Sequence, residues 1–434
     1  MRSTCLPLVA SLLVLSGSLL ACADADTDTS GAPGDHPAPH VVPFRIAPGQ
    51  SEVPFPARVS THDSGQDRGP TSTTYPAPHP AMPQIPRNGG VVLRHPSVVT
   101  VTFAGDPLQD KIEAFADQVV GLDWWSTVNA DYGVGAAESA ARVVIPKAPA
   151  AAIGDADLER WLAARIGDGT LPAPTDQTVY ALYYPQTTTV TLGDAEGGGA
   201  SCSTFLGYHT TVDVAVAGKT VHVAYAVINQ CGGGLDELTV TASHELTEAA
   251  TDPHPVDAST AGYVILDDGP WTGLGGEDAD MCAGVSSAAE AGFALTRVWN
   301  NRAAAAGDQP CLPVPGEGRG PFFDAGIVRE RLVAHLGGSA STEVDCYAFG
   351  ALPSRIRLKA QADEQAPLSL SFDHKTCTNG DKVTLTVSLR SGAQRGADYH
   401  YTLLAGLDGG GTGGAGDAGP GSAAHVWRGM VHVQ

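Results

Sequence analysis

The segment ASHELTEAATDP, residues 242–253, predicts one amphipathic helix that ends at a proline. Three glycines, residues 232–234, precede it as a loop, and Asp236 is a suitable N-cap residue. At about 100° per residue, His244 and Glu248 lie one turn apart on one face, while the apolar side chains form a separate stripe. We therefore expect a helix that buries its apolar stripe and presents a histidine and a glutamate together.

The string HELTE within this helix has the spacing of a metal-binding motif. In zinc peptidases, two ligands at i and i+4 hold the ion, and the adjacent glutamate accepts a proton from a metal-activated water. We predict His244 and Glu248 as metal ligands and Glu245 as the catalytic base. The usual motif has a histidine at the last position, so a carboxylate makes the site harder and less selective for zinc. The alternative is a histidine on a solvated, acidic helix face.

A third ligand is expected from the acidic turn GGEDADMC, residues 275–282. Two ligands on one helix leave the coordination incomplete, and metal sites of this kind take a further carboxylate from a later segment. Glu277 and Asp280 are the candidates. The alternative is a structural loop whose carboxylates accept hydrogen bonds from backbone N–H groups.

Two further histidines are candidates for the same site. His254 follows His244 by ten residues, the third-ligand spacing of some zinc peptidases, but Pro253 stiffens its approach, so it ranks behind the acidic turn. His209, beside Tyr208, is a candidate catalytic proton donor or substrate contact. Its alternative is a buried, hydrogen-bonded histidine.

The N-terminus predicts export. Residues 1–21 contain Arg2 and an apolar run that is too short to span a bilayer, followed by Cys22. This resembles a bacterial lipoprotein signal in which Cys22 is lipidated, and ordinary secretion is the alternative. We expect a cell envelope lipoprotein of the outer membrane or periplasm, or a secreted protein. Contact with a membrane is expected only through this lipid anchor.

Six cysteines remain beyond Cys22, and an even number in an oxidising compartment predicts disulfides. Their spacing suggests three successive pairs: Cys202 with Cys231, Cys282 with Cys311, and Cys346 with Cys377. The formal net charge of −22 argues against nucleic acid and anionic membrane surfaces as partners. We expect a monomer whose partner is a peptide or protein substrate or a component of the cell envelope.

The pattern of the chain predicts an α+β fold in which two folded domains follow a tether. Residues 22–88 are rich in proline, serine and threonine and predict a disordered tether. Residues 89–316 predict a mixed sheet with the metal-site helix packed against it, which is the organisation of a zincin-like domain by analogy. Residues 322–434 predict a β-sandwich-like domain of short alternating strands. The expected strands of the first domain lie within 91–103, 178–184 and 221–228, and its other helices at 110–120 and 158–166.

Several separated motifs resemble a group of exported bacterial proteins related to the exordium-like, phosphate-induced family. They are SHELTEAATDP at 243–253, GYH at 207–209, the E-x-x-D-x-C pattern at 277–282, and VWNN at 298–301 followed by PC at 310–311. The similarity covers roughly residues 90 to 315. It implies a zincin-like HExxE domain with these matching positions: His244, Glu245, Glu248, Glu277 and Asp280.

These features together predict an exported, lipid-anchored, metallopeptidase-like protein that holds one divalent metal ion, zinc. Glu245 would take a proton as water attacks a peptide carbonyl, then pass that proton to the leaving amine. Two carboxylate ligands lower the Lewis acidity of the ion, which favours slow or narrow activity. The alternative is a non-catalytic surface-binding or structural protein on a zincin-like scaffold.

Overall fold

The computed structural model describes residues 42–45, 71–193, 198–255, 259–266, 276–283, 285–314, 320–363, 365–407 and 423–434. The predicted signal segment 1–21, the lipidation site Cys22 and most of the predicted tether lie outside these ranges. Within the described part of the chain, no helix combines the length and the apolar character that crossing a bilayer requires.

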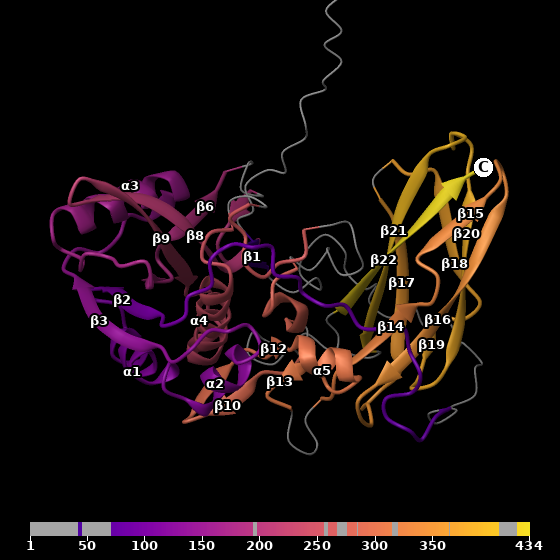
Figure 1. The fold of residues 1–434 in the computed structure, drawn as a ribbon, viewed down its shortest axis with the longest axis horizontal. Coiled ribbons are helices and arrows are strands. Elements are labelled where there is room, and N and C mark those ends of the chain that lie inside the picture. The colour runs from indigo at the N-terminus through magenta and orange to yellow at the C-terminus, as the bar shows by residue number, and fades with distance from the viewer. Residues whose placement is uncertain are drawn as a thin grey trace, which may run out of the picture. The chain divides into compact units, whose positions relative to one another are not determined.

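The first sheet has six strands in the order β1-β8-β9-β5-β2-β3 (Figure 1). Strands β3, β2, β5 and β9 run parallel to one another, whereas β8 and β1 are antiparallel to their neighbours. The strand bounds are Val42–Arg45 for β1, Ser97–Phe103 for β2, Glu138–Ile145 for β3, Thr178–Tyr184 for β5, Phe205–Val216 for β8 and Lys219–Asn229 for β9.

Strand β5 shows why this sheet is buried on both faces. Its sequence, TVYALYY, is a continuous apolar run without polar alternation, as expected for a central parallel strand. Val179 and Tyr183 pack into the core that contains helix α4 (Gly234–Thr251), and Tyr180 and Leu182 pack into the core that contains helix α3 (Asp155–Gly167). Helices α1 (Gln109–Val119) and α2 (Asp123–Asn129) share the core of α4.

Helix α4 is the element predicted from residues 242–253, and it extends further towards the N-terminus than expected. It begins at Gly234, with Gly233 at the N-cap position, and ends at Thr251, two residues before Pro253. The prediction of a single buried stripe is wrong, because nearly all side chains from Leu238 to Thr251 are buried. Contacts with β8 and β9 and also with β11 (Phe293–Leu295) enclose the helix, so the polar face is buried as well.

Residues 320–434 form a four-stranded sheet, β14-β16-β20-β18, and a five-stranded sheet, β15-β22-β21-β17-β19. The sequence predicts strands at 344–349, 354–359, 368–372, 382–389, 398–404 and 426–433, and each stretch overlaps a strand of the structure; β14, β15 and β19 are additional. The bounds are Phe323–Ile327 (β14), Arg331–Ala334 (β15), Ser339–Ala348 (β16), Ile356–Ala362 (β17), Leu368–Phe372 (β18), Thr376–Cys377 (β19), Lys382–Leu389 (β20), Asp398–Leu407 (β21) and Ala423–Val433 (β22).

Short elements complete the described chain. They are β4 (Ala152–Gly154), β6 (Thr189–Leu192), β7 (Gly199–Ala200), the 3₁₀ turn η3 (Asp280–Cys282), β10 (Ala288–Glu290), β12 (Val298–Trp299), α5 (Asn301–Ala306) and β13 (Cys311–Leu312). All three predicted disulfides are confirmed: Cys202–Cys231, Cys282–Cys311 and Cys346–Cys377. The last of these joins β16 to β19, which belong to different sheets.

The predicted fold class, an α+β zincin-like domain followed by a sandwich-like domain, is wrong. The chain is mostly β, with 39% strand and 18% helix distributed over several sheets. The prediction contains fewer strands because edge strands such as β3, ESAARVVI, lack a clear alternation of polar and apolar residues, and because many strands have only two to four residues. The three predicted helices are present as α1, α3 and α4, so the difference from the prediction lies in the strands.

The end of the predicted tether, residues 71–88, is ordered and packs against the folded chain. Ala77 is 1% exposed and donates its N–H to Asn379 Oδ1 at 3.0 Å, and the His79 ring stacks on Tyr347 with ring centroids 4.0 Å apart. The expectation of disorder is therefore wrong for this part. Single apolar residues between prolines are enough to anchor a segment whose unfolded state already has little conformational freedom.

Candidate metal centre

Strand alternation brings His209 to face helix α4. Its neighbour Tyr208 packs into the core of α3, so Gly207 and His209 point to the opposite face of the sheet. There β8 approaches α4 closely, since a Cβ atom built at Gly207 would lie 2.8 Å from Glu245 Oε1. A glycine at this position therefore lets the helix and the strand bring their polar side chains together.

The first group of metal-ligand atoms joins α4 to the acidic turn. His244 Nε2 lies 3.1 Å from Glu248 Oε1 and 3.4 Å from Asp280 Oδ1. One candidate oxygen or nitrogen from each of the three residues lies within 4.8 Å of the others. The disulfide Cys282–Cys311 joins the end of the turn to β13, and the Asp280 N–H donates to Glu248 Oε1 at 3.1 Å, which connects the turn to the helix.

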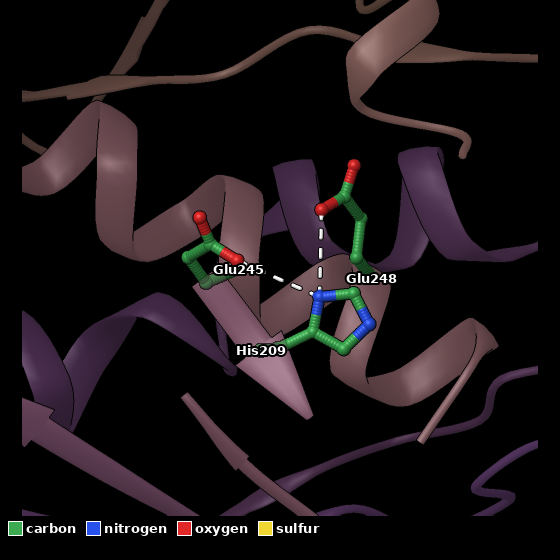
Figure 2. Close-up of side chains that lie close together, drawn as sticks. All are labelled: His209, Glu245 and Glu248. Atoms are coloured by element: carbon green, nitrogen blue, oxygen red, sulfur yellow. Dashed lines mark ion pairs between the residues drawn. The ribbon is translucent and has the colours of Figure 1, made fainter. Parts of the chain in front are cut away.

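A second group joins α4 to strand β8 (Figure 2). His209 Nδ1 lies 3.5 Å from Glu245 Oε2 and 3.6 Å from Glu248 Oε2, and one ligand atom from each of the three residues lies within 4.8 Å of the others. Figure 2 shows both carboxylates of α4 directed at the same ring nitrogen. Glu248 thus belongs to both groups.

Three further carboxylates surround the two groups. Glu277 Oε1 lies 3.4 Å from His209 Nε2, so the second candidate from the acidic turn faces the other histidine. Asp252 and Asp278 are buried completely, and neither was predicted. The Asp252 carbonyl lies 3.1 Å from His209 Nε2, and its Oδ1 accepts the Gly262 N–H at 2.8 Å.

Burial dominates the electrostatics of the cluster. Burial raises the pKa of Glu245 and of Asp252, and it raises the pKa of Glu248 well above the usual value. The pKa of Glu277 is raised to about 8 and that of Asp278 to about 7. Burial lowers the pKa of His209 and His244, but the neighbouring carboxylates outweigh it, and both pKa values lie well above the usual range. The cluster therefore requires positive charge, supplied either by protons or by a cation.

The donor set and its spacing fit a divalent metal ion. Imidazole nitrogen and carboxylate oxygen are ligands of zinc, manganese and iron. Ligand atoms about 2.1 Å from a tetrahedral ion lie about 3.4 Å from each other. The separations of 3.1 to 3.6 Å between histidine nitrogens and carboxylate oxygens agree with this value.

The predicted site residues converge, with one exception. His244, Glu245, Glu248, Glu277, Asp280 and His209 all border one buried cluster. His254 belongs to neither donor group, because its Nδ1 lies 3.0 Å from Thr211 Oγ1 and its ring packs near His222. Asp252 directly follows α4, and Asp278 lies between Glu277 and Asp280. The sequence feature that could have identified both residues is an acidic residue close to a candidate ligand.

No family model matches the sequence, and no curated protein matches it significantly. Several solved structures match at low similarity. Domains 4 and 5 of the S-layer protein SbsC match at 12% identity and a TM-score of 0.18, over 26% of this chain and 53% of theirs. WR4, a C. elegans MSP family member, matches at 10% identity and a TM-score of 0.18, over 25% of this chain and 97% of its own. Chimeric titin Z1Z2 matches at 15% identity and a TM-score of 0.14, over 26% of this chain and 94% of its own.

Proposed function

We propose that this chain is an exported metalloprotein that binds a divalent metal ion and hydrolyses peptide bonds. Zinc is the proposed ion. The observation that carries the proposal is the convergence of His244, Glu248 and Asp280 from two segments, with all three side chains buried. Buried carboxylates without compensating charge cost several kcal/mol each, and a cation removes that cost.

The residues around the ion have distinct roles in this proposal. Such an ion, when bound, acts as a Lewis acid and lowers the pKa of water towards about 7. Glu245 accepts the proton, since neither of its carboxylate oxygens has a hydrogen bond to the described residues. Its raised pKa brings it closer to the value of an efficient general base at neutral pH. His209, 3.5 Å from Glu245, stabilises the charge of that carboxylate.

A second candidate function is favoured by the burial of the cluster. His244, Glu245 and Glu248 are 0% exposed and Asp280 is 3% exposed. Structural metal sites are closed in this way, whereas catalytic sites keep a position open to water and substrate. The alternative is therefore a non-catalytic cell-surface binding or structural protein that is stabilised by its metal.

The proposal also includes a location. The chain contains three disulfides, which are typical of proteins outside the cytoplasm. We propose in addition that Cys22 carries a lipid anchor and that the chain is related to the exported, exordium-like bacterial proteins. A substrate in the cell envelope follows from this location.

Peptide cleavage by the wild type distinguishes the catalytic from the non-catalytic candidate, and the variant Glu245→Gln tests the role of Glu245. The mature protein is freed of metal with a chelator, reloaded with Zn²⁺ and incubated with a peptide library, and cleavage is followed by mass spectrometry. We expect the wild type to cleave peptides, and Glu245→Gln to lose about 10²- to 10⁴-fold in rate while it still binds zinc. Glu343→Gln, a change of a 45%-exposed carboxylate on β16, is the matched control and should have no effect.

Each contrary result has a defined meaning. Zinc binding without cleavage by the wild type supports the non-catalytic candidate. Equal cleavage by Glu245→Gln and the wild type removes Glu245 as the base. A wild type that binds no divalent metal contradicts both candidates.

A further inference from the structure

The two oxygens of Glu248 face different histidines. Oε1 lies 3.1 Å from His244 Nε2, and Oε2 lies 3.6 Å from His209 Nδ1. The histidines come from different elements, His244 from α4 and His209 from β8. A carboxylate in this position has one oxygen for each of two adjacent ligand groups.

Each of the two groups has a further carboxylate of its own. Asp280 completes the group of His244, with Oδ1 at 3.4 Å from Nε2, and Glu245 completes the group of His209, with Oε2 at 3.5 Å from Nδ1. The second group therefore has the same composition as the first: one imidazole, one carboxylate that belongs to that group alone, and Glu248, which both groups share.

The second group contains polar atoms that are buried without hydrogen bonds. They are His209 Nδ1, both oxygens of Glu245, and Glu248 Oε2; none has a hydrogen-bond partner among the described residues, and all three side chains are 0% exposed. Buried polar atoms in proteins are almost always satisfied, and an unexplained group of them points to an ion or ligand. Separations of 3.5 and 3.6 Å are too long for a hydrogen bond but suit two ligands of one ion.

The hydrogen bonding of His209 prepares its Nδ1 for a cation. Nε2 lies 3.1 Å from the Asp252 carbonyl oxygen, which can only accept, so Nε2 carries the proton in that contact. In the neutral ring, Nδ1 then presents a lone pair to Glu245 and Glu248, which also present lone pairs. Metal-ligating histidines commonly donate the opposite N–H to a backbone carbonyl in this way.

We propose that the cluster holds two divalent cations, one between His244 and Asp280 and one between His209 and Glu245, with Glu248 bridging them. This inference rests on the proposed metal binding by His244, Glu248 and Asp280 and adds the second ion. With that ion bound, Glu245 is a ligand, which replaces its role as the proton acceptor. Charge balance supports the second ion, because the cluster contains six buried carboxylates, and two divalent cations offset four of these charges whereas one offsets only two. Nitrogen and oxygen ligands in this ratio suit Mn²⁺, Fe²⁺ or Zn²⁺, and bridged pairs of such ions are usual at about 3.5 to 4 Å.

The test is metal stoichiometry together with magnetic coupling, and neither readout depends on activity. Metal-free protein is titrated with Mn²⁺ by calorimetry, desalted, and analysed for metal content and by electron paramagnetic resonance. We expect two Mn²⁺ per chain and the spectrum of a coupled pair in place of the six lines of isolated Mn²⁺. His209→Ala should reduce the content to one ion and restore the six-line spectrum, while His254→Ala, outside both groups, should retain two.

The outcomes distinguish this inference from the function on which it rests. One Mn²⁺ per wild-type chain, with six lines that His209→Ala does not change, overturns the second ion and leaves the proposed function in place. No bound Mn²⁺ or Zn²⁺ overturns both. The wild-type spectrum decides between one ion and two even if His209→Ala fails to fold.

Discussion

Residues around the cluster fix the orientation of its ligands. The Asp280 N–H donates a hydrogen bond to Glu248 Oε1, and the backbone carbonyl of Asp252 accepts one from His209 Nε2. Asp252 is itself held by the Gly262 N–H. Interactions of this kind orient metal ligands before an ion arrives, so less ordering entropy is lost on binding.

A buried carboxyl outside the cluster gives a prediction at the same scale. Asp324 on β14 is 1% exposed, and burial raises its pKa to about 8, against the hydrogen bond that its Oδ1 accepts from the Ala325 N–H. The folded state therefore binds more protons than the unfolded state between about pH 4 and about pH 8, and stability falls as the pH rises through this window. We expect Asp324→Asn to remove this loss, which is about 5 kcal/mol at most.

Urea unfolding at pH 5, 7 and 9 measures the effect. The difference in unfolding free energy between Asp324→Asn and the wild type should shift in favour of the variant as the pH rises. Asp157→Asn, at a side chain that is 65% exposed, should show no such trend. A constant difference between Asp324→Asn and the wild type at all three pH values would show that Asp324 is not protonated in the folded state.

At the scale of elements, the close approach of β8 to α4 depends on Gly207. An added Cβ would lie 2.8 Å from Glu245 Oε1, from Thr241 Cγ2 and from the Val227 carbonyl oxygen. We expect Gly207→Ala to destabilise the fold by about 1 to 3 kcal/mol, as overpacked cores do, and to weaken binding of the second proposed ion because its ligand Glu245 is displaced. Gly167→Ala is the control, since a Cβ there meets nothing within 4 Å and should be neutral or slightly stabilising.

Chemical denaturation and metal titration of the two glycine variants are the measurements. A Gly207→Ala protein with wild-type stability would mean that β8 and α4 separate easily. Loss of stability with an unchanged number and affinity of bound ions would mean that Glu245 is not a ligand of the second ion.

The disulfide of Cys282 gives a second prediction at this scale, because it follows Asp280 by two residues. A double change of Cys282 and Cys311 to alanine should cost about 3 to 4 kcal/mol by loop entropy and also reduce metal affinity. The pair Cys346 and Cys377 closes a loop of similar length, 31 against 29 residues, in the C-terminal sheets. Its double alanine variant should lose similar stability without loss of metal affinity.

Chemical denaturation measures the unfolding free energy of both double variants, and calorimetric titration measures their metal affinity. Equal metal affinity in the two variants would show that the disulfide does not position Asp280.

Local elements and the candidate site were largely predictable from the sequence. The helix of His244 and the central strand at 178–184 are set by periodicity and by a continuous apolar run, which act over a few residues. Local periodicity did not indicate that the polar face of α4 is covered by β11, which lies about fifty residues later. Asp278 was missed because an acidic turn has the same sequence whether it is solvated or buried.

At the scale of the whole molecule, the order of strands was not predictable. Strand β8 pairs with β1, more than 150 residues earlier, and β15 pairs in parallel with β22, nearly 100 residues later. Such pairings depend on long-range packing, not on local propensity. For the same reason the packing of residues 71–88 was missed, since its anchors Ala77 and Ile85 depend on partners beyond residue 300.

The last prediction concerns the stability of the complete chain. The sequence has a net charge of −22, and buried carboxylates add to the cost of folding unless a cation balances them. A ligand that binds only the folded state at about 100 times its dissociation constant stabilises by about 2.7 kcal/mol. For a folded chain of more than 300 residues, whose entropy of unfolding is correspondingly large, that should raise the unfolding temperature by about 3 to 4 °C.

Calorimetric scans of metal-free protein with and without Zn²⁺ or Mn²⁺ measure this shift. The double variant His209→Ala/His244→Ala should lose it, because both imidazole ligands are removed, while NaCl at matched ionic strength should not reproduce it in the wild type. Divalent ions also bind weakly to exposed carboxylates, and the double variant retains all of these. An equal rise in the wild type and the double variant would therefore assign the stabilisation to the acidic surface and remove the buried cluster as the metal site.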